Sequence, residues 1–331
     1  MSDQPGAHRL SRRSALRFGA LAILTPPLLA ACGPKDNTAP NGVDQLTPLY
    51  TAALADVAAA NAAAKAFPGD APTFQVLAQV RQAHATALAH EISRAAASST
   101  PPSVPPATAP APPASESDAI NVLVASLNKT AASTLGQDVQ RYRAGLVASI
   151  CGGCASVASA LNGSPVPNAA QTDQLLPAGT NPPGTALPGD TMAALQKALA
   201  AEHAAFWVCG TADTFLGGSA GTADDTATIV HQTRRDTTEQ IITAGGGTPV
   251  QSQAAYRTPQ PITDQNSALA ALAVAEQDAE VAWRSVAENT DDRTLRSVAQ
   301  TALIGAVLWQ TAWRHLAGTT PASVAMPGQP A

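Results

Sequence analysis

Residues 190–216 read DTMAALQKALAAEHAAFWVCGTADTFL, and this stretch decides the fold. It opens with Asp and Thr, which are common caps of helix N-termini, and it contains no proline. Its apolar side chains recur at helical spacing and place Leu195, Leu199 and Phe206 on one face. The stretch therefore predicts a helix that is buried along this face, and Glu202 falls inside the buried stripe.

The rest of the chain repeats this helical pattern. Aromatic residues make up only 4% of the chain, and no run of alternating β-branched residues is long enough for a strand. In each half, two predicted helices precede a long connection and two more follow it. The connection at 245–263 is long enough to run the length of a bundle, as the single crossover of ferritin-like folds does. We therefore predict an all-α fold of tandem four-helix bundles, the C-terminal one ferritin-like; one irregular helical domain is the alternative.

Proline-rich stretches and helix caps divide the chain into six segments. The part that follows the first segment exceeds the usual size of a single core, which favours more than one domain. The expected segments are a signal peptide at 1–31, a tether at 32–45, an N-terminal helical bundle at 46–162 with a Pro-rich loop at 99–114, a linker at 163–189, a ferritin-like four-helix bundle at 190–318 and a disordered tail at 319–331.

The first 32 residues have the layout of a bacterial export signal. A basic segment that includes Arg12-Arg13 precedes an apolar stretch at 18–31, which ends in Leu29-Ala30-Ala31-Cys32. The paired arginines match the twin-arginine signal, although Ala15 stands where that pattern usually has an aromatic residue. Leu29-Ala30-Ala31-Cys32 resembles the lipobox, whose cysteine receives a diacylglyceryl group. We predict a lipoprotein held by Cys32 at the extracytoplasmic face of the cell membrane.

An uncleaved membrane helix is the alternative for this N-terminal segment. It is disfavoured because the apolar stretch is shorter than the roughly 20 residues that cross a bilayer, and because it contains Pro26-Pro27. Cleavage removes four arginines and one aspartate, so the formal charge moves from −5 to −8. An acidic surface disfavours nucleic acid as a partner. We expect contact with the membrane through the lipid anchor and with an unknown protein or small molecule.

Four short motifs in the second half resemble a known family. They are LQKALAAEHAA from Leu195, HQTRRD from His231, AAYRTPQP from Ala254 and AWR from Ala282. Together they are similar to the ferritin-like domain of unknown function found in actinobacterial proteins, often lipoproteins. The resemblance spans about residues 190–318. It implies a four-helix ferritin-like bundle and implies no activity.

Charged residues on the buried faces of this bundle are the candidate site residues. Glu202 and Glu276 each lie about twelve residues into a predicted helix, which at about 1.5 Å per residue places both near mid-height. His231, Arg234 and Arg235 lie at a similar depth on a third helix. Because an isolated buried carboxylate costs several kcal/mol, we expect these five side chains to form a buried polar network that fixes the helix register. Side chains that reach solvent are one alternative.

A degenerate metal site formed by Glu202, His231 and Glu276 is the other alternative. Ferritin-like di-iron sites add a Glu-x-x-His motif from each of two helices, and here the position three residues after each of these glutamates is alanine. The last predicted helix has no carboxylate beyond its first turn. The ligand set is therefore incomplete, and we predict no resident cofactor, with iron or another metal kept as the alternative.

Three cysteines besides Cys32 lie in the part of the chain predicted to be exported, where disulfides persist. Cys151 and Cys154 have the spacing of a redox pair, but thioredoxin-like chemistry expects that motif beside a βαβ unit, and none is predicted. A structural disulfide is therefore favoured. Either the pair closes on itself or one member reaches Cys209, and one thiol is left over.

Two classes of function follow from these features. The first is a non-enzymatic envelope lipoprotein whose helical bundles bind a partner or have a structural role. The second is a metal-binding or redox protein that uses a degenerate ferritin-like site. The incomplete ligand set favours the first class, and the sequence has no phosphate-binding loop after a strand.

Overall fold

Helices account for almost all regular structure in the described part of the chain. The computed structural model describes residues 43–97, 102–103, 111, 113–163, 166–167 and 186–329. Within these residues it has eight α-helices, three short 3₁₀ helices and no strand. The prediction of an all-α fold is confirmed. The predicted signal peptide, Cys32, most of the tether and much of the Pro-rich loop and the linker lie outside the described residues.

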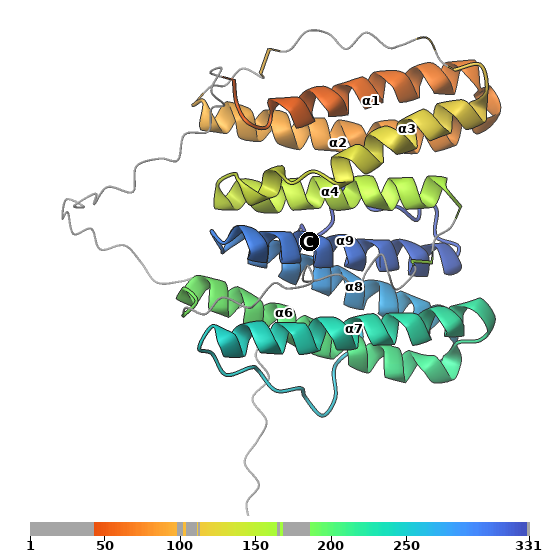
Figure 1. Ribbon diagram of the computed structural model, residues 1–331. Helices are drawn as coiled ribbons and strands as arrows, with labels where there is room; N and C mark the ends of the chain where they lie inside the picture. The colour runs from red at the N-terminus through yellow and green to blue at the C-terminus, as the bar shows by residue number, and fades with distance from the viewer. Residues whose placement is uncertain are drawn as a thin grey trace, which may run out of the picture. The chain divides into compact units, whose positions relative to one another are not determined.

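The first four helices form the N-terminal bundle (Figure 1). They are α1 (Thr47–Ala66), α2 (Ala71–Ala95), α3 (Glu116–Ala131) and α4 (Arg141–Leu161). α1 and α4 each pack against both α2 and α3. Alanines on the inner face of α1 are buried and let its neighbours approach closely. α3 begins where the Ser115 hydroxyl accepts a hydrogen bond from the backbone N–H of Asp118.

The remaining four helices form the C-terminal bundle. They are α6 (Gly189–Ala212), α7 (Gly218–Ala244), α8 (Gln265–Glu288) and α9 (Arg293–Leu316). α6 packs against α7 and α8, and α8 packs against α9. Aspartates cap α8 and α9, where the side chains of Asp264 and Asp292 accept hydrogen bonds from backbone N–H groups in the first turns.

The segment that joins α7 to α8 runs along α6 as a crossover. We call residues 245–264 the crossover segment. Gln196, near the start of α6, bonds to the backbone of Thr248 and Val250, and the ring of Trp207, three turns later, lies 5.9 Å from that of Tyr256. The segment therefore follows α6 over several turns, as a crossover in a four-helix bundle would.

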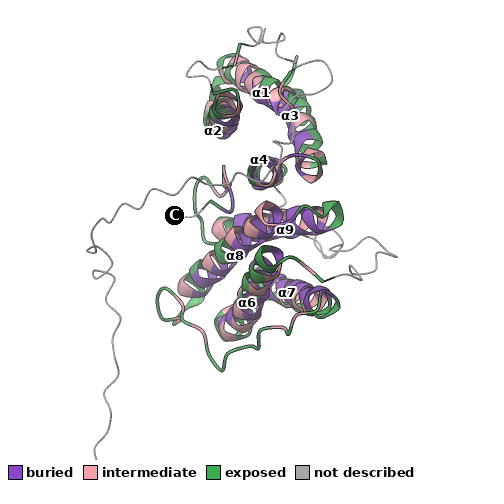
Figure 2. Cartoon of the chain, turned by 90° about the vertical axis from the view of Figure 1, so that its left-hand side faces the viewer, coloured by how far each residue is buried: buried purple, intermediate pink, exposed green. Residues whose placement is uncertain are grey.

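The two bundles share one interface through α4. This helix packs against α8 and α9 as well as against α2 and α3, and Figure 2 shows it between the two groups, with buried residues around it. Among the described residues, it is the one helix that is long and apolar enough to cross a bilayer. However, 78% of its most apolar 18-residue stretch is buried inside the protein. The packing thus agrees with two bundles. One apolar cluster includes residues of both, such as Ile150 and Leu303, and a second cluster lies within the C-terminal bundle.

The C-terminal segment differs from the predicted disordered tail. Residues 319–329, which we call the C-terminal strap, lie against α2, α4 and α8. Backbone groups of the strap form the contacts, which include Val324 N to Ser156 Oγ at 2.9 Å, Ser149 Oγ to Pro327 O at 2.6 Å, Ala325 O to His84 Nε2 at 2.7 Å and Gly328 N to Glu280 Oε2 at 3.3 Å. The segment is ordered because the helices satisfy its backbone hydrogen bonds.

Two glycines of α4 make room for the strap. A Cβ atom on Gly153 would lie 2.1 Å from the carbonyl oxygen of Ala325, and one on Gly152 would lie 2.8 Å from the ring of Pro327. Any larger residue at these positions would displace the strap. The Cys-Gly-Gly-Cys sequence therefore has a packing role in its two central residues.

Candidate functional site

Three helices of the C-terminal bundle bring together Glu202, His231 and Glu276. The imidazole of His231, on α7, lies between a carboxylate from α6 and one from α8. Its Nδ1 is 2.8 Å from Oε2 of Glu202, and its Nε2 is 3.1 Å from Oε1 of Glu276. No more than 1% of any of the three side chains is exposed. We call these three residues the buried triad.

The charges of the buried triad stabilise one another. Burial by itself lowers the pKa of His231, but the charge of Glu276 and the hydrogen bonds that the ring donates to both carboxylates raise it to about 9. Burial raises the pKa of Glu202, but the hydrogen bond and charge of His231 and the charge of Arg234 bring it below its ordinary value. At neutral pH the site therefore holds an imidazolium that donates one hydrogen bond to each carboxylate.

Two further residues surround the triad. The indole Nε1 of Trp283 donates a hydrogen bond of 2.6 Å to Oε1 of Glu202, so both oxygens of that carboxylate are engaged. The side chain of Arg234 is completely buried, and no hydrogen-bond acceptor among the described residues reaches its guanidinium. Arg234 acts on the triad through its charge, which lowers the pKa of Glu202.

Arg235 lies apart from the buried triad. Its guanidinium is 4.9 Å above the ring of Phe206 and forms an ion pair with Asp236, whose side chain is 48% exposed. Of the five residues predicted to form one network, Glu202, His231 and Glu276 are in contact and Arg234 is a nearby charge. Arg235 lies outside the network, on the outer side of α7.

The triad has the geometry of a hydrogen-bonded chain. The two carboxylates face opposite nitrogens of one ring, so they cannot converge on an ion that the same ring binds. Among the described residues, no group of three or more His, Cys, Asp or Glu side chains is arranged to hold a metal ion. The arrangement suits charge neutralisation and helix registration.

Glu280 is a buried acid that the sequence reasoning missed. It lies one turn after Glu276 on α8, with 1% of its surface exposed, and its Oε2 accepts a hydrogen bond from the backbone N–H of Gly328 in the strap. Burial, together with the charge of Glu276, raises its pKa to about 8, so the side chain is protonated at neutral pH. Its spacing of four residues from Glu276, on the same helix face, was the signal that could have found it.

A second buried polar cluster lies in the N-terminal bundle. Arg81 donates hydrogen bonds to Asp56 Oδ2 at 2.8 Å and to Cys154 Sγ at 3.1 Å, and it contacts His84 Nδ1 at 2.9 Å. Burial and the charge of Arg81 lower the pKa of His84 to about 3, so its imidazole is neutral. The cluster pairs the arginine with one carboxylate and joins α1, α2 and α4.

The three cysteines besides Cys32 are free in the structure. Cys151, Cys154 and Cys209 are all buried, and no disulfide joins them. Burial raises the pKa of each thiol, that of Cys154 to about 12, so the reactive thiolate form is suppressed. The structure therefore does not bring any two of the three together as the predicted disulfide.

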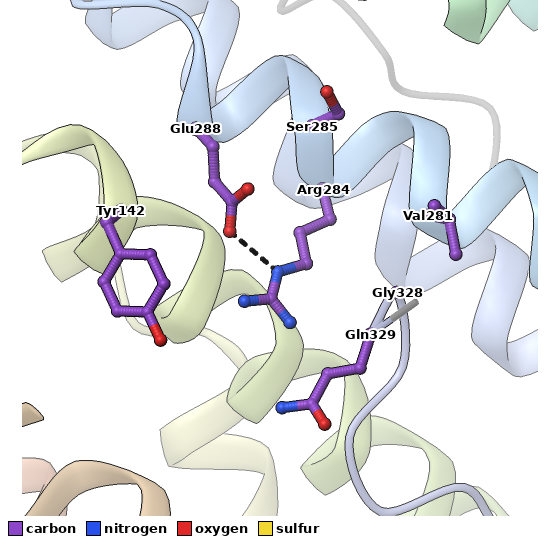
Figure 3. Close-up of a pocket in the computed structure, with 7 residues that line it drawn as sticks. All are labelled: Tyr142, Val281, Arg284, Ser285, Glu288, Gly328 and Gln329. Carbon is purple, nitrogen blue, oxygen red and sulfur yellow. Dashed lines mark hydrogen bonds and ion pairs between the residues drawn. The ribbon is translucent and has the colours of Figure 1, made fainter. Parts of the chain in front are cut away.

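Two clefts open on the surface of the C-terminal bundle. The strap cleft, of about 500 Å³, lies between α4, α8 and the strap and is lined by Tyr142, Arg284, Ser285, Glu288 and Gln329, among others (Figure 3). In that view the guanidinium of Arg284 faces the cleft, where its Nε already bonds to Glu288 at 2.9 Å.

The second, of about 390 Å³, is the crossover cleft. It lies between α6, α7 and the crossover segment. Its lining includes Phe206, Trp207 and Gly210 of α6, Arg235 of α7, and Gln253 and Tyr256 of the crossover segment.

Comparison with known proteins gives a match in the C-terminal region. Residues 194–331 match a family described as a domain of unknown function, DUF4439. The C-terminal region is a DUF4439 domain. The match spans nearly all of the C-terminal bundle, including the triad, and it extends through the strap.

A solved structure is similar to part of this chain. It is that of a conserved hypothetical protein, Rv2844, from Mycobacterium tuberculosis, with 28% sequence identity and a TM-score of 0.38. The similarity covers 39% of this chain and 99% of the other. Among curated proteins, no match is found.

Proposed function

We propose that the chain is an envelope lipoprotein, anchored through Cys32 at the extracytoplasmic face of the cell membrane, where its helical unit serves as a non-enzymatic binding protein. The observation that supports the anchor is Cys32 itself, directly after Leu29-Ala30-Ala31 and an apolar stretch behind Arg12-Arg13. Each acyl CH₂ buried in a membrane adds about 0.8 kcal/mol, and two or more chains give stable attachment.

A binding role is favoured over catalysis by the way the charged groups are used. The imidazole of His231 is engaged at both nitrogens, and Glu202 at both oxygens, by other buried side chains. A general base or nucleophile needs access to a substrate atom, and the fully buried triad has none. The clefts at the surface, in contrast, offer polar and aromatic side chains to a ligand.

Membrane fractionation tests the anchor. Cells that express the full chain, the Cys32→Ala variant or the Cys209→Ala variant are lysed, and their membranes are washed with high salt and carbonate. Cys209 is a buried thiol, so its variant controls for the loss of a cysteine. We expect the wild type and Cys209→Ala to stay with the membranes and Cys32→Ala to be released. Retention of Cys32→Ala after both washes would overturn the anchor.

Elemental analysis tests the non-enzymatic, metal-free role. The full chain is purified without chelators and compared with Glu276→Ala. We expect both proteins to hold no stoichiometric metal. About one metal ion per chain, lost in Glu276→Ala, would replace the binding role with a metal-dependent function.

A further inference from the structure

The crossover cleft contains two neighbouring aromatic side chains that are partly exposed. Trp207 and Tyr256 lie with ring centroids 5.9 Å apart, and both side chains are partly exposed. The other three tryptophans, Trp283, Trp309 and Trp313, are completely buried. Exposed aromatic faces in a cleft are suited to stacking against the ring of a ligand.

Arg235 gives the cleft a positive charge. Its guanidinium lies over the ring of Phe206, 4.9 Å from the ring centroid, as arginine commonly does on aromatic faces. None of the described residues that line the cleft is acidic. Arg235 does form an ion pair with Asp236, but that carboxylate is 48% exposed, and exposed pairs contribute little energy. A ligand anion can therefore replace or share this contact, and a planar guanidinium binds carboxylates well.

Hydroxyl and amide groups complete the lining. Thr211, Ser252 and Gln253 lie among the aromatic residues, together with His203. The cleft thus combines ring faces, one guanidinium and several neutral groups that can donate and accept hydrogen bonds. The volume of about 390 Å³ lies within the usual range of small-molecule sites, about 300–1,000 Å³.

We propose that the crossover cleft binds an acidic saccharide, with a sugar ring stacked on Trp207 beside the tilted ring of Tyr256, its carboxylate on Arg235 and its hydroxyls on the amide and hydroxyl side chains. This inference rests on the proposed binding role and names its ligand class. A cation would meet Arg235, and an apolar chain would leave the polar lining groups without partners. The strap cleft is less suited to an anion because Glu288 already neutralises Arg284.

The surroundings of Gly210 provide a steric test of the cleft. A Cβ atom on this residue would meet no atom within 4 Å, so Gly210→Leu places its side chain in open space. Replacing glycine inside a helix also favours the helical state. The variant therefore fills the cleft without disturbing the core, and circular dichroism checks that it folds.

Tryptophan fluorescence of the full chain reports binding, because Trp207 is the one tryptophan that is not completely buried. Trigalacturonate is titrated as the acidic probe and maltotriose as the neutral one. For the wild type we expect a saturable fluorescence change with trigalacturonate. Arg235→Gln should bind it about tenfold more weakly, and Gly210→Leu should not bind it. Arg293→Gln, which removes another exposed, ion-paired arginine, should bind as the wild type does.

Three results would overturn the inference. They are no saturable change at millimolar trigalacturonate, equal affinity for both trisaccharides, or unchanged affinity in Arg235→Gln and Gly210→Leu. Calorimetry needs no fluorescent signal, and it should show that Trp207→Phe binds trigalacturonate more weakly than the wild type does. The fractionation of Cys32→Ala is independent of these titrations, so a failure of the ligand class is distinguishable from a failure of the anchor.

Discussion

The Nδ1 atom of His231 lies 2.8 Å from Oε2 of Glu202, so an ionic hydrogen bond joins α7 to α6 inside the C-terminal bundle. The other ring nitrogen extends the connection to Glu276 on α8. One imidazolium therefore sets the relative position of three helices. Removing it would leave two buried carboxylates facing each other without a cation between them.

We predict that His231→Gln lowers the free energy of unfolding by about 3–5 kcal/mol, because breaking a buried ion pair leaves uncompensated charge. His315→Gln is the matched control, since His315 is exposed on α9 and should change stability by less than about 0.5 kcal/mol. Urea unfolding followed by circular dichroism measures both. If His231→Gln were as stable as the control, the triad would not be the structural connection described above.

The free energy of unfolding should decrease as the pH rises into the alkaline range, for two reasons. His231 has a folded-state pKa of about 9, above its ordinary 6.5, so its contribution is fully present below pH 6.5 and is lost as pH rises through 9. Glu280 has a pKa of about 8 against an ordinary 4.5, so its stabilising effect is present below pH 4.5 and is lost as pH rises through 8.

Glu280→Gln should flatten the part of this profile between pH 4.5 and 8. The amide keeps the shape of the protonated acid and cannot ionise, so the variant should be more stable than the wild type near pH 8. Thermal unfolding at several pH values measures the difference. Parallel profiles for the two proteins across this range would contradict a buried protonated Glu280.

Gly153→Ala tests the seat of the C-terminal strap. Alanine normally stabilises a helix relative to glycine by up to about 1 kcal/mol, and Gly210→Ala, where the Cβ meets open space, should show that gain. At Gly153 the new Cβ would lie 2.1 Å from Ala325 O, so we expect a loss of about 1–3 kcal/mol. The two variants, measured side by side by urea unfolding, should change stability in opposite directions. A gain in both would mean that the strap does not pack there.

How far the sequence predicts this structure depends on how local the signal is. Helix positions follow from capping residues such as Asp264 and from alanine-rich periodicity, which are read within a few residues. The similar height of Glu202 and Glu276, on either side of His231, could be anticipated because each lies at mid-height of a predicted helix. Only one of Arg234 and Arg235 can face the core, because adjacent residues on a helix do not share a face, and the sequence alone did not choose between them.

The strap could not be predicted because its partners are distant in sequence. Residues 319–329 have no periodicity of their own, and they are ordered by groups such as Ser149 and Ser156 on α4. Similarly, the spacing of Cys151 and Cys154 predicts a disulfide, whereas both thiols are free and buried in the structure. Arg81 donates a hydrogen bond to the sulfur of Cys154. Contacts of this kind depend on tertiary packing that no local pattern contains.

Thiol titration distinguishes the free cysteines of the structure from the disulfide that the sequence favours. In the folded protein, Cys151, Cys154 and Cys209 should react slowly with Ellman's reagent, because burial raises their pKa values and shields them. In denaturant without reductant, all three should react. A single reactive thiol after denaturation would show that two of them form a disulfide.

The most direct test of the account is the mass of the N-terminal peptide of the protein purified from membranes. The proposed anchor predicts that this peptide begins at Cys32 and that the cysteine bears a diacylglyceryl group. A peptide that begins at Met1, or one in which Cys32 has no lipid, would contradict the proposal that this helical protein works as a lipoprotein of the cell envelope.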